Sequence, residues 1–323
     1  MIAATGTPAT STTSAQPQTD ARSLAPDHLR RLEGVGARFA AALPPLLVQA
    51  QRIANTFAHG THGRRRAGPG ETFWQFRAYE RGDSAAAIDW RRSASSDRLY
   101  VREREWEAAQ TVQLWCDLSG SMDYRSDLAA VTKRERGLVL NLALADILAR
   151  SGERIGQLGV MPPRLNRNAP GKIVTALHSA GVALDTGRKT RAFDSLPPDE
   201  ALPGRSLAVL ISDFLEPMDV ITARVRKLAA SGATGHLVHI LDPIEETFPF
   251  SGRTEFVGFE DAGRHLTDEA GGLRGAYHAR LKERKTALRR LADQLRWSYL
   301  VHHTDKPAQG ALLAVHTRLS GGR

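Results

Sequence analysis

The chain has 323 residues, of which 41% are hydrophobic and 24% charged, and 44 Lys and Arg against 35 Asp and Glu give a formal net charge of +9. A chain of this length and composition can bury a sizeable core, in one large domain or two small ones. Its one cysteine, Cys116, excludes a disulfide framework and a thiolate metal cluster, so we expect a cytoplasmic protein.

The first 23 residues are rich in Ala, Thr and Ser, without a basic start or an apolar core. This composition predicts a disordered tail and not a signal peptide. No later stretch reaches the roughly 18 to 20 continuous apolar residues that a membrane helix requires. Apolar residues recur at three- and four-residue steps between Leu24 and Phe57, which predicts helix, ended or kinked at Pro44-Pro45.

Residues 71–107 alternate too irregularly for a long helix and predict a small β-rich region. Four charged residues of this region have two possible interpretations: Arg77, Asp83, Asp89 and Arg91. They are either a docking surface or a partly buried network of ion pairs that fixes the region in place. We favour the ion-pair interpretation for Arg77 and Asp89.

A buried strand is predicted at Val112 to Cys116, where only Gln113 is polar. Asp117, Ser119 and Ser121 follow it, at the strand end where open α/β sheets place their ligands. One carboxylate and two hydroxyls at this spacing converge if the turn curls, and such oxygen ligands favour Mg²⁺ or Ca²⁺. The alternative is an ordinary polar turn in which a serine caps the next helix.

A second apolar run, Ser206 to Ile211, is followed by Ser212 and Asp213. Between the two runs we expect a long helix, which Ser126-Asp127 would cap and which would end near Arg150. Two strands that each end in an aspartate, joined through a helix, place Asp117 and Asp213 side by side.

Strands and helices continue to alternate along the rest of the chain, which predicts a doubly wound, mostly parallel α/β sheet. The further strands are expected at 155–161, 236–241 and 298–302, and the further helices at 173–184, 220–230, 272–297 and 310–319. Asp242, Glu245 and Glu246 follow the strand at 236–241, and as loop acids we expect them to face solvent. The basic face of the helix at 272–297 is likewise explained by solvation.

The segment Asp117-Leu118-Ser119-Gly120-Ser121, with an aspartate after a later strand, resembles the metal-ion-dependent adhesion site of the von Willebrand factor A fold. The preceding segment resembles the signature of the bacterial family called domain of unknown function 58. That signature comprises Gly70, Phe73, Arg77-Ala78-Tyr79, Gly82-Asp83, Ile88-Asp89-Trp90 and Ala94. The resemblance covers roughly residues 60–315. It implies a von Willebrand factor A-like domain at 109–323, preceded by a helical and β-rich region at 24–108.

The resemblance also implies a threonine ligand from a loop between the two aspartates. Thr186 and Thr190 are the candidates, and Thr190 is the closer match, although the proline-broken segment after it departs from the family pattern. The predicted metal ligands are therefore Asp117, Ser119, Ser121, Thr190 and Asp213, with Mg²⁺ or another divalent cation as cofactor. The implied partner is a MoxR-type AAA+ ATPase.

These features predict a metal-dependent protein-interaction module, an adaptor of the ATPase that acts on a client protein. The net charge of +9 favours the approach of an acidic partner surface. The alternative is a magnesium-dependent phosphoester hydrolase, because a cation with open positions can activate water. We favour the non-enzymatic function, since no nucleophile elbow, P-loop or HExxH motif occurs. The triplet Arg64 to Arg66 can grip phosphate, but loop arginines are usually solvated, and we do not expect nucleic-acid binding.

Overall fold

The computed structural model describes residues 2–5, 35–58, 67–81, 83–105, 109–186, 191–258 and 263–321. The chain divides into two compact units, a main unit of residues 1–59 and 110–323 and a second unit of residues 60–109. The helix at residues 35–58 therefore belongs to the main unit, although the sequence predicts one region at 24–108. Among the residues described, no helix is both long and apolar enough to cross a membrane.

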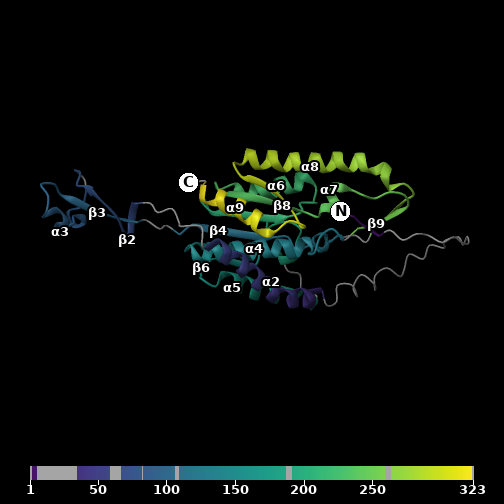
Figure 1. Cartoon of the computed structure of the whole chain (residues 1–323), viewed down its shortest axis with the longest axis horizontal. Coiled ribbons are helices and arrows are strands. Elements are labelled where there is room, and N and C mark those ends of the chain that lie inside the picture. Colours follow the sequence, from purple (N-terminus) through teal and green to yellow (C-terminus); the bar gives the residue numbers. More distant parts are fainter. Residues whose placement is uncertain are drawn as a thin grey trace, which may run out of the picture. The chain divides into compact units, whose positions relative to one another are not determined.

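The main unit is built on a six-stranded sheet in the order β11-β8-β7-β4-β5-β6. Its strands are β4 (Thr111–Cys116), β5 (Arg154–Gln157), β6 (Met161–Leu165), β7 (Leu207–Ser212), β8 (Thr234–Leu241) and β11 (Ser298–His303). All neighbours pair in parallel except β5 and β6. The predicted α/β fold with a mostly parallel sheet is thereby confirmed (Figure 1).

Helices cover both faces of the sheet (Figure 1). One face carries α2 (Val35–Ala58), α4 (Lys133–Arg150), α5 (Ala169–Asp185) and α9 (Ala308–Gly321). The other carries α6 (Met218–Ala229) and α8 (Arg274–Gln294). Successive strand residues point to opposite faces, so Leu114 and Cys116 pack in the first layer and Trp115 in the second.

Helix α4 approaches β4 closely. A Cβ at Gly137 would lie 2.9 Å from the Cys116 Sγ atom, so only glycine fits there without displacement. The helix begins at Lys133, seven residues after the predicted cap Ser126, because Thr132 forms a capping box with Glu135. Ser126 instead donates its backbone N–H and its hydroxyl to Asp242, which holds the segment before α4 as a loop.

Three other expectations differ from the structure. Pro44 and Pro45 lie inside α2 and do not end it; on either side of them Leu43 and Leu46 are buried in the core. The single strand predicted at 155–161 is two antiparallel strands, β5 and β6, because Gly159 (φ 73°) lies in the turn between them. The predicted N-terminal tail contains a strand, β1 (Ile2–Thr5).

Strand β1 pairs with β9 (Thr254–Gly258), which also pairs with β10 (Arg264–Thr267). This three-stranded sheet is antiparallel. A small aromatic cluster joins Phe256 of β9 to Phe248, Phe250 and Tyr277. The turn between β8 and β9 contains the short helix α7 (Pro243–Thr247).

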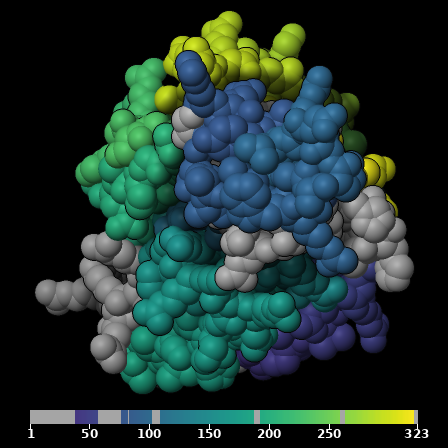
Figure 2. Space-filling view, turned by 90° about the vertical axis from the view of Figure 1, so that its left-hand side faces the viewer, coloured from purple at the N-terminus to yellow at the C-terminus, as the bar shows by residue number. Residues whose placement is uncertain are grey.

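The second unit consists mainly of a two-stranded antiparallel sheet, β2 (Ala67–Ala78) and β3 (Tyr100–Glu105), with the short helix α3 (Trp90–Ser93). Figure 2 draws the part of this unit from the end of β2 through α3 to the start of β3 in blue. Arg77 binds both carboxylate oxygens of Asp83, at 2.6 and 2.7 Å, as the ion-pair interpretation requires. Asp89 caps α3 by accepting the Arg92 N–H. Trp90, in contrast, is 64% exposed.

Candidate metal centre at the ends of β4 and β7

The carboxyl ends of β4 and β7 bring two aspartates into one buried polar cluster. Cys116 pairs with Ile211 in the parallel ladder, and the Asp117 N–H extends this pairing by donating to the Ile211 carbonyl at 2.8 Å. Asp117 and Asp213 follow directly on the two neighbouring strands, and each is only 1% exposed. The structure therefore places these two predicted ligands at one end of the sheet.

The turn after β4 curls back on Asp117. The Ser119 N–H donates to the Asp117 Oδ1 atom at 2.9 Å, and the hydroxyls of Ser119 and Ser121 lie 3.3 Å apart. Ser119 precedes the 3₁₀ turn at Gly120–Asp123, but its side chain makes no capping hydrogen bond. The interpretation of this segment as an ordinary serine-capped turn is therefore not supported.

The spacing of these oxygens suits a small hard cation. Magnesium–oxygen bonds of about 2.1 Å place neighbouring octahedral ligands about 3 Å apart, close to the separation of the two serine hydroxyls. Burial, together with the nearby charge of Asp213, raises the pKa of Asp117 to about 7, although hydrogen bonds from Ser119 and Ser212 oppose the rise. Among the residues described, Asp117 forms no ion pair, although the charge of Arg134 acts on it.

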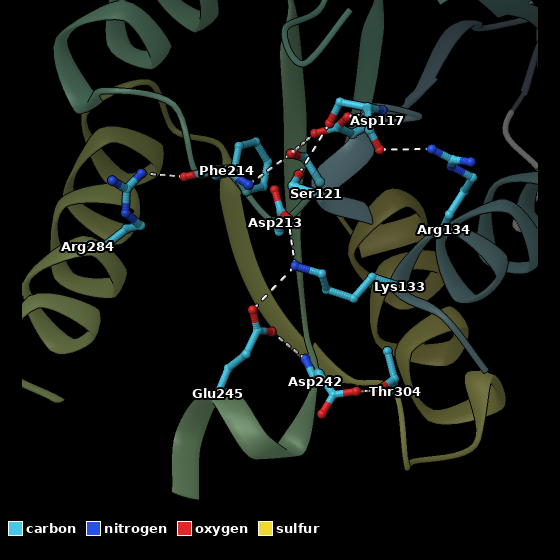
Figure 3. A network of polar contacts seen from close by, with 12 residues as sticks. Asp117, Ser121, Lys133, Arg134, Asp213, Phe214, Asp242, Glu245, Arg284 and Thr304 are labelled. Carbon is cyan, nitrogen blue, oxygen red and sulfur yellow. Dashed lines mark hydrogen bonds and ion pairs between the residues drawn. The ribbon is translucent and has the colours of Figure 1, made fainter. Parts of the chain in front are cut away.

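Ser212, which is not among the predicted ligands, donates its hydroxyl to the Asp117 Oδ2 atom at 2.6 Å. The same hydroxyl accepts the Phe214 N–H at 2.8 Å and so shapes the turn after β7. Phe214 has a positive φ of 47°. Arg284 of α8 stabilises this turn by donating to the Phe214 and Glu216 carbonyls (Figure 3).

Lys133, the first residue of α4, supplies a positive charge inside the cluster. Its side chain is fully buried, and its Nζ atom lies 2.6 Å from the Asp213 Oδ2 atom and 3.3 Å from the Glu245 Oε1 atom (Figure 3). Burial lowers the pKa of an ammonium group, but the two carboxylates outweigh it and hold the pKa of Lys133 above its usual value. The same ion pair keeps the pKa of Asp213 below its usual value despite burial.

Two of the three acids after β8, Asp242 and Glu245, are buried, contrary to the expectation that they face solvent, whereas Glu246 is partly exposed. Asp242 is fully buried and Glu245 is 3% exposed. They form a capping box at the start of α7, and Asp242 also accepts hydrogen bonds from Ser126. Burial raises the pKa of Glu245 to about 7, against the opposing effect of Lys133. The contact with Lys133 explains why Glu245 points inward.

Arg134 fixes the backbone of the turn after β4. Its guanidinium donates to the Leu118 carbonyl at 2.8 Å and the Ser119 carbonyl at 3.0 Å, and pairs with Asp123 at 2.6 Å. The two basic residues that open α4 thus act on the two sides of the cluster, Lys133 on the acids and Arg134 on the serine turn.

The threonine implied by the resemblance is not placed at the cluster. Thr190 lies outside the residues that the structure describes. Thr186 is exposed at the end of α5, where its hydroxyl donates to the Ala183 carbonyl. Within the described ranges there is no group of three or more His, Cys, Asp or Glu side chains able to hold a metal. A cation at this cluster would therefore depend on the serine hydroxyls.

Comparisons with known proteins agree with the sequence signature. The family model described as "Protein of unknown function DUF58" matches residues 75–287. Uncharacterized protein Rv1480 of Mycobacterium tuberculosis and Uncharacterized protein Mb1516 of Mycobacterium bovis are each 27% identical to the chain over 226 residues, which is 66% of this chain and 68% of theirs.

Two solved structures are similar over 66% of this chain and all of their own length, each with a TM-score of 0.37. One is the conserved hypothetical protein BatB from Bacteroides thetaiotaomicron, at 15% identity. The other is an aerotolerance-related membrane protein from Bacteroides fragilis, at 14% identity.

Proposed function

The chain belongs to the family described as protein of unknown function DUF58, and we propose that it is a metal-dependent protein-interaction module. The ends of β4 and β7 would hold Mg²⁺, and the cation would bind a carboxylate of a partner protein. The observation that carries the proposal is the convergence of Asp117, Ser119 and Ser121 with Asp213 in one buried cluster.

The charges of the cluster support a divalent cation. Four buried acids, Asp117, Asp213, Asp242 and Glu245, lie at this end of the sheet with the single buried lysine Lys133, while Arg134 pairs with Asp123. Negative charge is therefore in excess when the acids are ionised, and a divalent cation would offset it. Because Lys133 already pairs with Asp213, we propose that Asp117, Ser119 and Ser121 bind the cation directly, while Asp213 and Lys133 set the charge around it.

The cation would supply an electrophilic contact for the partner. Mg²⁺ in proteins usually keeps several positions for water, and a carboxylate from another chain can replace one of them. Such a contact gives specificity beyond buried area, since it requires both the metal and an acid at one place. The net charge of +9 also favours the approach of a partner protein with an acidic surface. The family resemblance suggests a MoxR-type AAA+ ATPase as this partner, in the cytoplasm, with an unknown client.

The first experiment measures the cation itself. Calorimetric titration of Mg²⁺ should show one site in the native chain and none in Asp117→Ala, whereas Asp127→Asn, which removes an exposed carboxylate from the following loop, should bind normally. Circular dichroism of Asp117→Ala shows whether the variant is folded. A folded Asp117→Ala protein that binds Mg²⁺ as well as the native chain would refute the metal centre.

The second experiment measures the partner. Binding to a MoxR-type AAA+ ATPase, the proposed partner, titrated in Mg²⁺ and again in EDTA, should be lost in EDTA and in Asp117→Ala. Binding that is indifferent to both would exclude metal-bridged docking. Magnesium-dependent turnover of a generic phosphoester that disappears in Asp117→Ala would instead support the hydrolase alternative.

A further inference from the structure

A groove runs along helix α8 in the main unit, with a cavity volume of about 470 Å³. It is lined by Glu246, His278, Leu281, Lys282, Lys285, Thr286 and Arg289. Its volume falls within the range of small-molecule binding sites. None of these residues belongs to the cluster of Asp117 and Asp213.

Four nitrogen-bearing side chains form a stripe on this side of α8. His278, Lys282, Lys285 and Arg289 follow one another at steps of four, three and four residues, which places them on one helical face. Lys282 and Arg289 are exposed, as expected for a solvated face, and the same side chains line the groove. The buried face of the same helix is formed by other residues, Leu288, Leu291 and Ala292.

One carboxylate already occupies part of the groove. Glu246 pairs with Lys285 through its Oε1 atom, and its Oε2 atom lies 2.9 Å from the His303 Nε2 atom. The groove therefore binds carboxylate oxygens within the chain itself. This internal pair also neutralises the charge of Lys285.

Two further cations remain available to a ligand. Lys282 and Arg289 have no acidic partner among the described residues, and the Arg289 guanidinium lies over the Tyr299 ring at 5.8 Å. In the same described part of the chain, the buried His278 Nε2 atom has no hydrogen-bond partner. Leaving the histidines aside, three positive charges and one negative charge line the groove, so a dianion would balance it.

We propose that the α8 groove binds a small phosphate monoester as its dianion, with Lys282 and Arg289 holding the phosphate and Leu281 contacting the apolar part of the ligand. A guanidinium can bind two phosphate oxygens at once, and an ammonium adds a point charge. The limited volume of the groove favours a small molecule over an extended polymer.

Calorimetric titration with phenyl phosphate at pH 8 tests the site, and phenyl sulfate serves as the monoanionic comparison. Phenyl phosphate should bind more tightly than phenyl sulfate. Arg289→Gln and Lys282→Gln should each weaken phenyl phosphate binding by roughly tenfold, the effect of losing one charge-assisted contact. Glu246→Gln should strengthen it, because removal of the internal carboxylate frees Lys285.

Arg290→Gln is the matched control, since Arg290 is exposed on the same helix and does not line the groove. It should leave binding unchanged. Absence of saturable binding, equal binding of the two ligands, or equal losses in Arg290→Gln and Arg289→Gln would each overturn the proposal. Asp117→Ala should keep the phosphate site intact, so this test does not depend on the metal centre.

Discussion

The largest loss of stability that we predict for a single substitution is at the fully buried Lys133. Its ammonium contacts the carboxylates of Asp213 and Glu245, which are both buried. Replacing Lys133 with Met therefore leaves two acids in the core without a positive charge beside them. Removing one partner of a buried ion pair typically costs about 3–5 kcal/mol. We expect Lys133→Met to lower the free energy of unfolding by that amount at pH 7.5, as measured by urea denaturation.

The matched control is Lys172→Met, which removes an exposed lysine from helix α5 and should change stability by less than about 0.5 kcal/mol. The double variant Lys133→Met with Asp213→Asn should recover part of the loss, because one of the stranded charges is then absent. A loss below about 1 kcal/mol in Lys133→Met would contradict the assignment of Lys133 as the internal counterion of these acids.

Sequence reasoning found the acids at the strand ends and missed their counterion. Asp117 and Asp213 each follow an apolar run, and the parallel sheet alone brings such positions together. Lys133 opens a helix, where a lysine is ordinarily solvated, and its partners lie 80 and 112 residues away. Glu245 was expected in solvent for the same reason. No local pattern reveals that these charges meet, because their burial is decided by the tertiary structure.

At the level of elements, the start of α4 positions both basic residues of the cluster. Thr132 accepts the Glu135 N–H at 3.0 Å, and the Glu135 carboxylate accepts the Thr132 N–H at 2.8 Å. Loss of such a cap costs about 1 kcal/mol. We expect Thr132→Ala to lower the free energy of unfolding by roughly this amount in urea denaturation.

Thr132→Ser, which retains the hydroxyl, should stay close to the native chain. If the serine variant lost as much stability as the alanine variant, the methyl group of Thr132, and not its hydrogen bond, would be responsible. The cap also explains why the helix starts after the predicted position. Ser126 has the residue type of a cap, but its hydroxyl is used by Asp242.

Elements were predictable where their pattern was local. The apolar runs of β4 and β7 and the alternation of strands with helices were sufficient for the parallel sheet. The continuity of α2 across Pro44 and Pro45 was not predictable from local sequence. Prolines inside a helix destabilise it, and here the burial of one face of α2 in the core compensates for that loss. Strand β1 was also missed, because it pairs with β9, about 250 residues away in the chain.

On the scale of the whole molecule, a fall in pH changes the stability of the folded chain through groups that act in opposite directions. Burial lowers the pKa of both His236 and His302 to about 4, so both rings are neutral in the folded chain at neutral pH. Below pH 6.5 these histidines are protonated in the unfolded chain but not in the folded one, which favours unfolding. Their contribution to stability is therefore present above pH 6.5 and is lost as the pH falls toward 4. Asp117 and Glu245, with pKa values raised to about 7, gain stability over the same range by binding protons.

Because these contributions oppose one another, the pH dependence of the total stability does not isolate the effect of the histidines. The difference in stability between the native chain and a histidine variant does isolate it. His236→Gln keeps a neutral polar group beside the Ser298 hydroxyl, 2.5 Å from the native Nδ1 atom, and cannot protonate. Between pH 7.5 and 5, the native chain should lose about 2 kcal/mol relative to this variant, because the His236 pKa of about 4 lies well below that of an unfolded histidine. Urea denaturation at the two pH values measures it. An unchanged difference would mean that His236 is protonated as readily in the folded chain as in the unfolded one.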